Sequence, residues 1–173
     1  MNRNELLIRL DRLDEEVSLL FDGKFRFRLV IVGGGALVYL NCIQRATLDI
    51  DALDVSYDIL HLLKHFDIDC RVNAYMNNFP YNYDDRLIKL DVGGRRIDFY
   101  SLSLEDIIIS KLYSSRAKDW DDITNENLLQ VVDWDKLERL ALDEDEAKTS
   151  RLNDRVYSEF MQSYLDYIRR YRK

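Results

Sequence analysis

Residues 29–51 decide the fold, and they read Leu-Val-Ile-Val-Gly-Gly-Gly-Ala-Leu-Val-Tyr-Leu-Asn-Cys-Ile-Gln-Arg-Ala-Thr-Leu-Asp-Ile-Asp. The stretch opens with Leu29–Val32, which is short, apolar and rich in β-branched residues, a pattern that predicts a buried strand. Three glycines follow, and Ala36–Ile43 is long enough for two turns of helix. The stretch closes where apolar and acidic residues alternate. This alternation predicts a second strand with Asp49 and Asp51 on one face.

Each half of this stretch suits a different component of a metal–nucleotide complex. A glycine-lined start of a helix, at Gly33 and Gly34, lets backbone N–H groups approach a phosphate, and paired carboxylates suit a hard divalent cation. The glycines match no P-loop, and a dinucleotide fingerprint needs glycine where Val38 stands. Close packing of strand and helix without a ligand is the alternative reading of the glycines. With the acidic pair beside them, we expect nucleotide chemistry.

The flanking sequence predicts an α/β (α+β) fold in which a small mixed sheet is flanked by helices. Before the central stretch we expect an amphipathic helix at 4–22 and a strand at 25–32. After it we expect a strand at 48–55, a helix at 56–66, a strand at 68–72, a loop at 73–85, and two strands, 86–92 and 95–100, joined by a two-residue turn at Gly93-Gly94. The chain is then helical, with helices at 104–117, 125–132, 134–146 and 149–171. We therefore predict a core at 1–100 and a helical region packed on it at 101–173.

Charge and composition narrow the classes of function. The formal net charge is −7, which opposes avid nonspecific binding of nucleic acid. A basic stripe for RNA remains open at the C-terminal residues Arg151, Arg155, Arg169, Arg170, Arg172 and Lys173. The two cysteines form no disulfide framework, and we find neither a signal peptide nor an apolar run long enough to cross a membrane. We expect a cytoplasmic protein with buried thiols and no membrane partner.

A third carboxylate is available in Arg96-Ile97-Asp98-Phe99-Tyr100, on a strand that we expect to neighbour the acidic one. Three acidic groups on adjacent strands can bridge two Mg²⁺ ions about 3.5–4 Å apart, as nucleotidyl transfer requires. With Asp98 included, the motifs of the chain resemble those of the nucleotidyltransferase superfamily, which has the DNA polymerase beta-like fold. The motifs are Gly33-Gly34 with Ala36-Leu37, Arg45-Ala-Thr47-Leu-Asp49-Ile-Asp51, Arg96-x-Asp98, Ser103-Leu-Glu-Asp-Ile-Ile-Ile-Ser-Lys111 and Arg116-Ala-Lys-Asp119-Trp-Asp-Asp122.

Within the superfamily, the match is to small bacterial members related to the abortive-infection (AbiEii-type) toxins of type IV toxin–antitoxin systems, over residues 29 to about 123. The resemblance implies that Asp49, Asp51 and Asp98 hold Mg²⁺ (or Mn²⁺), and that Asp98 also acts as general base. It implies phosphate contacts from Gly33 and Gly34, and neutralisation of the triphosphate by Lys111. It also places Arg116, Asp119 and Asp122 among the nucleotide-binding residues. Gly35 departs from the pattern, because members usually carry serine or another small residue there.

Several of these residues also have a plain structural reading. Lys111 can reach past the helix to solvent instead of the core. Asp119 and Asp122 either orient Lys111 or Arg116 or form a solvated helix start. Arg45 and Thr47 either brace the site or serve structure alone. The tyrosines of the 73–85 loop, Tyr75, Tyr81 and Tyr83, fit loop packing better than stacking on a base, and we expect His61 and His65 at the surface.

The sequence thus predicts an enzyme that transfers a nucleoside monophosphate from an NTP to a hydroxyl of tRNA, protein or a small molecule. The resemblance suggests the toxin of a type IV pair, with a cognate antitoxin as its partner. The alternative is a catalytically silent nucleotide- or partner-binding module of the same fold. A nucleotidyltransferase that modifies antibiotics is a third reading with the same core.

Overall fold

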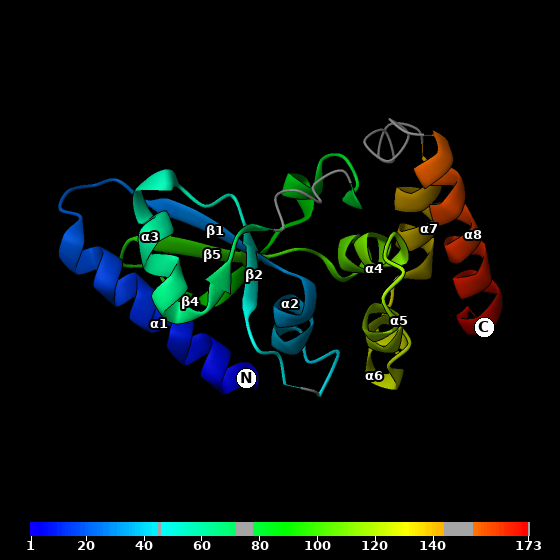
Figure 1. Cartoon of the computed structure of the whole chain (residues 1–173), viewed down its shortest axis with the longest axis horizontal. Helices are drawn as coiled ribbons and strands as arrows, with labels where there is room; N and C mark the ends of the chain where they lie inside the picture. Colours follow the sequence, from blue (N-terminus) through cyan, green and yellow to red (C-terminus); the bar gives the residue numbers. More distant parts are fainter. Residues whose placement is uncertain (45, 72–77, 144–153, 173) are drawn as a thin grey trace. The chain divides into compact units, whose positions relative to one another are not determined.

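The computed structural model describes residues 1–44, 46–71, 78–143 and 154–172. The chain divides into two units (Figure 1). Unit 1 contains Met1–Asn73 and Leu87–Leu102, and unit 2 contains Ala74–Arg86 and Ser103–Lys173. The change from sheet to helices predicted at residue 100 lies next to the division at Leu102, whereas the 74–86 segment groups with unit 2.

Unit 1 holds a mixed sheet whose strands lie in the order β3-β2-β1-β5-β4. The central strand β1 pairs antiparallel with β2 and parallel with β5, while β3 adds to β2 in parallel and β4 pairs antiparallel with β5. The strands are β1 (Phe27–Val32), β2 (Ile50–Leu53), β3 (Ile68–Asp69), β4 (Ile88–Gly93) and β5 (Ile97–Ser101). With helices flanking this sheet, the chain has the predicted α+β architecture of a small mixed sheet and flanking helices.

Helices pack on the apolar face of the sheet. Helix α1 (Arg3–Leu20) begins with a capping box at Asn2 and buries Leu6, Leu10, Leu13 and Val17. Helix α2 (Gly33–Tyr39) follows β1 without a loop. A Cβ at Gly35 would lie 3.3 Å from Ile31 and 3.7 Å from Leu6, so α1, α2 and β1 meet at a point where no larger residue fits without movement.

A buried carboxylate ties α1 to the β4–β5 hairpin. Asp14 is fully buried and accepts hydrogen bonds from the backbone N–H groups of Arg95, Arg96 and Ile97, at 2.8, 2.8 and 2.7 Å. Three donors compensate the cost of removing a charged group from water. The side chain of Asp14 therefore fixes the turn of the hairpin against the helix.

Several predicted strand bounds are wrong, and β3 covers only the first two residues of the strand expected at 68–72. The acidic strand was expected at 48–55, but β2 begins at Ile50, so Asp49 lies in a bend and Leu48 is 89% exposed. Because β3 pairs only with Ile50 and Asp51, no ladder extends to Asp49. The β4–β5 turn spans 94–96 instead of two residues, since Gly93 still pairs with Asp98 at a register shift.

The connection between β2 and β3 is helical, as predicted, with Ser56 as its cap, but it divides into three short pieces. They are the 3₁₀ turn η1 (Tyr57–Ile59), α3 (Leu60–Leu63) and the 3₁₀ turn η2 (Lys64–Phe66). His61 and His65 are exposed, as expected. Cys42 is buried, whereas Cys70 is only partly so.

In unit 2, the described residues form α-helices, their connecting loops and the 3₁₀ turn η4 (Tyr83–Arg86). Its helices are α4 (Leu104–Leu112), α5 (Ala117–Ile123), α6 (Glu126–Leu129), α7 (Trp134–Leu142) and α8 (Asp154–Tyr171). Ser103 caps α4 as predicted, but this helix ends five residues before the expected Ala117. Helix α8 buries Phe160, Tyr164 and Tyr167, and the Tyr167 hydroxyl donates to the Ile123 carbonyl at 2.7 Å. Tyr75 lies outside the described residues, and Tyr81 is exposed.

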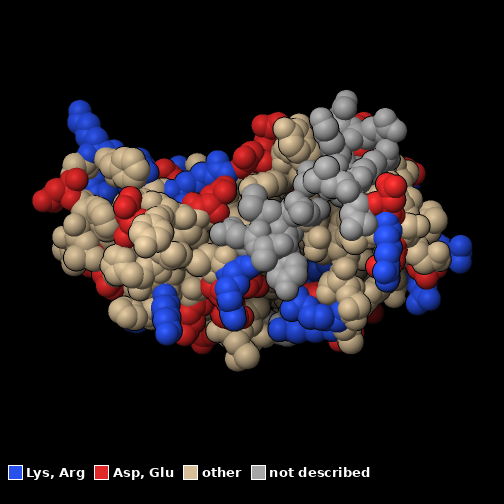
Figure 2. Space-filling model, turned by 45° about the horizontal axis from the view of Figure 1, so that its top comes forward, with Lys and Arg blue, Asp and Glu red and all other residues tan. Residues whose placement is uncertain are grey.

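Charged side chains of both signs are interspersed on the face drawn in Figure 2. Three arginines of the predicted stripe have acidic partners: Arg155 with Glu159, Arg169 with Asp166, and Arg172 with both Asp135 and Glu138. Arg151 and Lys173 of the predicted basic stripe lie outside the described residues. In the part of the chain that the structure describes, no helix has the length and apolar character needed to cross a membrane.

Candidate functional site

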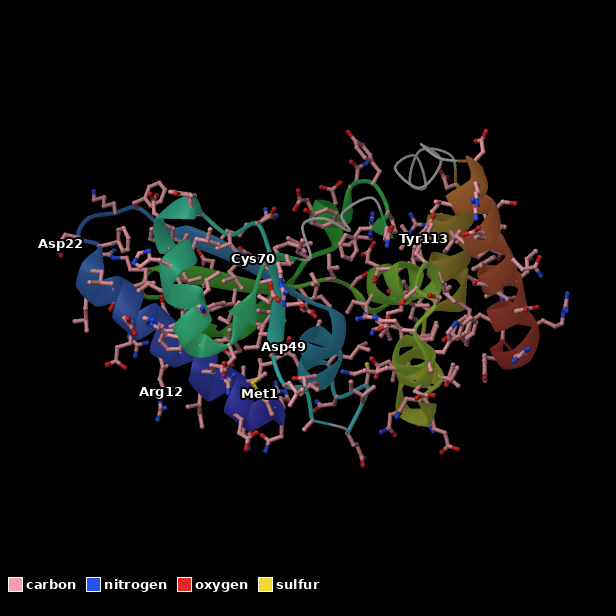
Figure 3. The ribbon with its side chains drawn as sticks, in the orientation of Figure 1. Met1, Arg12, Asp22, Asp49, Cys70 and Tyr113 are labelled. Carbon is pink, nitrogen blue, oxygen red and sulfur yellow. The ribbon has the colours of Figure 1, made fainter. Side chains whose placement is uncertain are left out.

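The glycine turn and the acidic strand meet at the end of β1. Val32 is the register partner of Asp51, and Gly33 begins α2 in the left-handed region, with φ of +59°. A Cβ at Gly33 would lie 3.0 Å from Asp51 Oδ2. Only glycine combines this backbone angle with space for the carboxylate. The structure thus brings together Gly33 and Asp51, with Gly34 next in α2 and Asp49 in the exposed bend before β2 (labelled in Figure 3).

Gly35 allows close packing between α2 and its apolar neighbours. It is buried, and its neighbours are the side chains of Ile31, Leu6 and Ile50. A serine at this position, which the resemblance implies, would place its side chain against apolar neighbours here. The close-packing reading therefore holds for Gly35, while Gly33 faces a carboxylate.

An acidic residue that the motifs did not single out lies beside Asp51. Asp69 is the register partner of Asp51 on the parallel strand β3, so the two side chains leave the same face of the sheet on neighbouring strands. Both oxygens of Asp69 accept from Arg71: Oδ1 from its backbone N–H at 2.9 Å, and Oδ2 from Nε at 2.7 Å and from Nη2. The hydrogen bond from the Arg71 side chain holds the pKa of Asp69 below its ordinary value.

Asp98 lies elsewhere on the sheet. Its strand, β5, neighbours β1 and not β2, so the expectation that the two acidic strands are adjacent is wrong. Asp98 pairs with Arg28, whereas Asp51 pairs with Val32, four residues further along β1. At about 3.3 Å per residue, this register separates the two carboxylates by more than one metal ion can span.

The carboxylate of Asp98 already has two basic partners. Arg26 donates to both oxygens, each at 2.8 Å, and Lys89 Nζ lies 3.0 Å from Oδ1. The hydrogen bond from Arg26 is the main cause that lowers the pKa of Asp98 to about 2. The role of Asp98 as metal ligand and general base stays a prediction, and its register and partners favour a structural ion pair.

The remaining predicted residues belong to unit 2, where they form one network with buried members at Lys111, Asp119 and Asp122 and an exposed arginine at Arg116. Lys111 Nζ donates to Asp119 Oδ1 at 2.5 Å and to Asp122 Oδ2 at 2.9 Å, and all three residues are buried. Arg116 Nε and the Ser114 hydroxyl each donate to Asp119 Oδ2 at 2.6 Å. Burial alone would raise the pKa of Asp119, but these hydrogen bonds outweigh it and lower that pKa.

Two readings of this network are thereby decided. Lys111 does not reach to solvent, and Asp119 and Asp122 are not a solvated helix start. Both aspartates accept from Lys111, and Asp119 also accepts from Arg116, as the reading in which they orient these cations expected. A buried lysine shared by two carboxylates stabilises unit 2, and the contact of Lys111 with a triphosphate stays a prediction.

Comparison with known proteins agrees with this geometry. A family model described as a nucleotidyltransferase of unknown function, DUF6036, matches residues 8–172. The chain belongs to this nucleotidyltransferase family. No curated protein and no solved structure matches it. The superfamily expected from the glycine and Asp-x-Asp motifs is confirmed.

For this member of the DUF6036 family, sequence reasoning missed Asp69 and Arg71. The signal was present in Ile68-Asp69-Cys70, where an acidic residue again stands between apolar ones, but a strand of two residues gives little periodicity to detect. Of the two residues suggested as a brace, Arg45 lies outside the described residues. Thr47 is buried, and its N–H donates to the Met1 carbonyl at 3.2 Å, so it ties the approach to β2 to the start of α1.

Proposed function

We propose that this chain is a Mg²⁺-dependent nucleotidyltransferase that transfers a nucleoside monophosphate from an NTP to a hydroxyl group. The family description supports the reaction class. The observation that carries the proposal is the close approach of the Asp51 carboxylate to Gly33, where a Cβ would lie 3.0 Å from Oδ2, because it joins an acidic strand to the glycine start of a helix. A triphosphate bound at the glycines would have its metal ligands beside it.

The donor set suits a hard divalent cation. Asp49 and Asp51 supply carboxylate oxygens, which Mg²⁺ and Mn²⁺ prefer, and Asp69 adds a third carboxylate in register with Asp51. Among the described residues, no three such side chains already converge on one metal position, which agrees with Asp69 being engaged by Arg71. A bound ion would neutralise the charge of the triphosphate and of the leaving pyrophosphate.

In the proposed reaction the acceptor oxygen attacks the α-phosphorus of the NTP. The new bond is that oxygen to the α-phosphorus, the bond from the α-phosphorus to the bridging oxygen breaks, and pyrophosphate leaves. The hydroxyl proton passes to a carboxylate. We propose Asp69 for this role, which the sequence assigned to Asp98, because Asp69 is the carboxylate in register with Asp51.

Calorimetric titration with the four NTPs in Mg²⁺ tests the proposal. The wild type should bind at least one NTP, and Asp49→Asn/Asp51→Asn should abolish binding because the metal ligands are lost. The matched control is Glu15→Gln/Asp22→Asn, which removes two exposed charges of the same unit and should bind as the wild type does. If the wild type binds no NTP, the enzyme proposal is wrong.

A silent nucleotide-binding module is the second candidate. It is favoured by the position of Asp98, which is engaged by Arg26 and Lys89 four register positions from Asp51. Such a module would bind an NTP with Mg²⁺ but transfer no labelled nucleotide to any acceptor. A labelled-NTP transfer assay against tRNA, the protein itself and small hydroxyl compounds therefore separates the two candidates.

The biological setting is proposed from the resemblance alone. A toxin of a type IV pair should arrest growth when the wild type is expressed in bacteria without its antitoxin, and Asp49→Asn/Asp51→Asn should not. Normal growth with an active enzyme would instead favour a small-molecule acceptor. Both outcomes are read from growth curves at matched protein levels.

A further inference from the structure

Arg71 stands among the carboxylates of the proposed metal site. It lies two residues after Asp69, and its backbone N–H, Nε and Nη2 all donate to that carboxylate. Asp69 in turn is in register with Asp51. The guanidinium therefore already places a positive charge where carboxylates of β2 and β3 lie side by side.

Arg71 interacts with its surroundings mainly through the charges of neighbouring carboxylates. Its side chain is 89% exposed, so packing does little to hold it. The hydrogen bond to Asp69 is the main cause that raises the pKa of Arg71, and the charges of Asp69, Asp49 and Asp51 add to it. An exposed arginine held by an ion pair exchanges partners at little cost when a stronger cation or anion arrives.

We propose that Arg71 is the internal counter-ion of this site, which a divalent cation displaces from Asp69 and which then binds the phosphates of the nucleotide. This inference rests on the proposed function. A divalent ion and a guanidinium on the same carboxylates repel each other, so binding of the ion favours release of Arg71. Once released, its planar fork matches a phosphate and stays next to the site.

The proposal makes opposite predictions for the free metal and for the metal–nucleotide complex. Without nucleotide Arg71 competes with the ion, so its removal should strengthen metal binding. With nucleotide present it contributes a contact, so its removal should weaken binding of the complex. A residue that merely supports β3 would weaken both.

The test is a titration of the full chain with Mn²⁺, followed by electron paramagnetic resonance of the free ion. Arg71→Gln should bind Mn²⁺ about two- to fivefold more tightly than the wild type, the range expected for release from an exposed ion pair. Arg71→Lys, which keeps the charge, should stay near the wild type. Arg12→Gln removes an exposed positive charge on α1 and controls for the change in net charge.

The second measurement is calorimetric binding of a non-hydrolysable ATP analogue at saturating Mn²⁺, where Arg71→Gln should bind more weakly than the wild type. Equal or weaker Mn²⁺ binding by Arg71→Gln, with a wild type that does bind Mn²⁺, overturns this inference and leaves the proposed function standing. If neither protein binds Mn²⁺, the proposed function fails and this inference fails with it. Tighter Mn²⁺ binding by Arg12→Gln to the same degree also overturns it.

Discussion

Gly33 allows the glycine turn and the acidic strand to lie close together. A Cβ would lie 3.0 Å from Asp51 Oδ2 on a backbone with φ of +59°. Gly33→Ala should therefore lower the free energy of unfolding by about 1–2 kcal/mol and weaken Mn²⁺ binding, because the carboxylate must shift. Denaturant unfolding and Mn²⁺ titration measure the two effects.

Gly23→Ala is the matched control for this substitution. Gly23 also has a positive φ, +107°, but nothing lies within 4 Å of a Cβ there. It should lose stability through backbone strain while Mn²⁺ binding is unchanged. Equal loss of metal binding in both variants would show that the contact with Asp51 is not what matters.

The ion pairs of Asp98 predict how the stability of the folded protein depends on pH in the acidic range. The pKa of Asp98 is about 2 in the folded protein against an ordinary 3.8, so its contribution to stability is present above pH 4 and is lost as the pH falls toward 2. Asp98→Asn should be less stable than the wild type at pH 5, and the difference should shrink between pH 4 and 2. Urea midpoints across this range measure it.

Arg26→Gln removes the main partner of Asp98 and should show the same dependence on pH. A difference between the wild type and Asp98→Asn that stays constant down to pH 2 would contradict the ion pair. If Asp98 instead holds a metal, as the motif predicted, then Asp98→Asn should also abolish binding of Mn²⁺.

At the scale of elements, Asp14 joins α1 to the β4–β5 turn. Asp14→Ala leaves three backbone N–H groups without their acceptor, so we expect a loss of about 3 kcal/mol or more in the free energy of unfolding. Chemical denaturation measures this loss. Asp11→Ala, on the same helix and half exposed beside Arg95, should change stability by less than about 0.5 kcal/mol.

The network between α4 and α5 makes the matching prediction for unit 2. Lys111→Met leaves Asp119 and Asp122 buried without their shared cation, and should cost about 3–5 kcal/mol. Lys118→Met, exposed on α5, is the control and should have little effect. A stable Lys111→Met protein that has lost only nucleotide binding would support the triphosphate role that the motif implied.

Local signals predicted the elements well and their ends less well. The helices were predicted from the capping residues Ser56 and Ser103 and from the apolar spacing of α1. These signals are local, because capping and apolar spacing act within a few residues. The start of β2 was misplaced since alternation continues through Leu48, although no partner strand lies there to pair with it. Asp14 could have been noticed, because it stands at helical spacing between the buried residues Leu10 and Val17.

At the scale of the whole molecule, the order of the strands had no local signal. The motifs placed the glycine turn and Asp51 correctly because they are close in sequence. The pairing of β5 with β1 joins segments far apart in the chain, and its register alone separates Asp98 from Asp51. Sequence patterns predict which face a side chain takes but not how far along a distant strand it lies.

Net charge yields a prediction for the whole chain. At −7, and with Arg155, Arg169 and Arg172 each paired to an acidic residue, the surface offers little to a phosphate backbone. Binding to unrelated single-stranded RNA at physiological salt should be weaker than a Kd of about 10⁻⁴ M. Fluorescence anisotropy checks this, and micromolar, salt-dependent binding would instead support the basic stripe.

The anchor at Asp14 has a consequence for synthesis on the ribosome. Its three backbone donors follow it by 81, 82 and 83 residues. A growing chain therefore carries α1 with this charge uncompensated until the hairpin turn has emerged. During that interval the carboxylate must remain hydrated, which opposes premature burial of the apolar face of α1 and delays completion of unit 1 until its last strand is made.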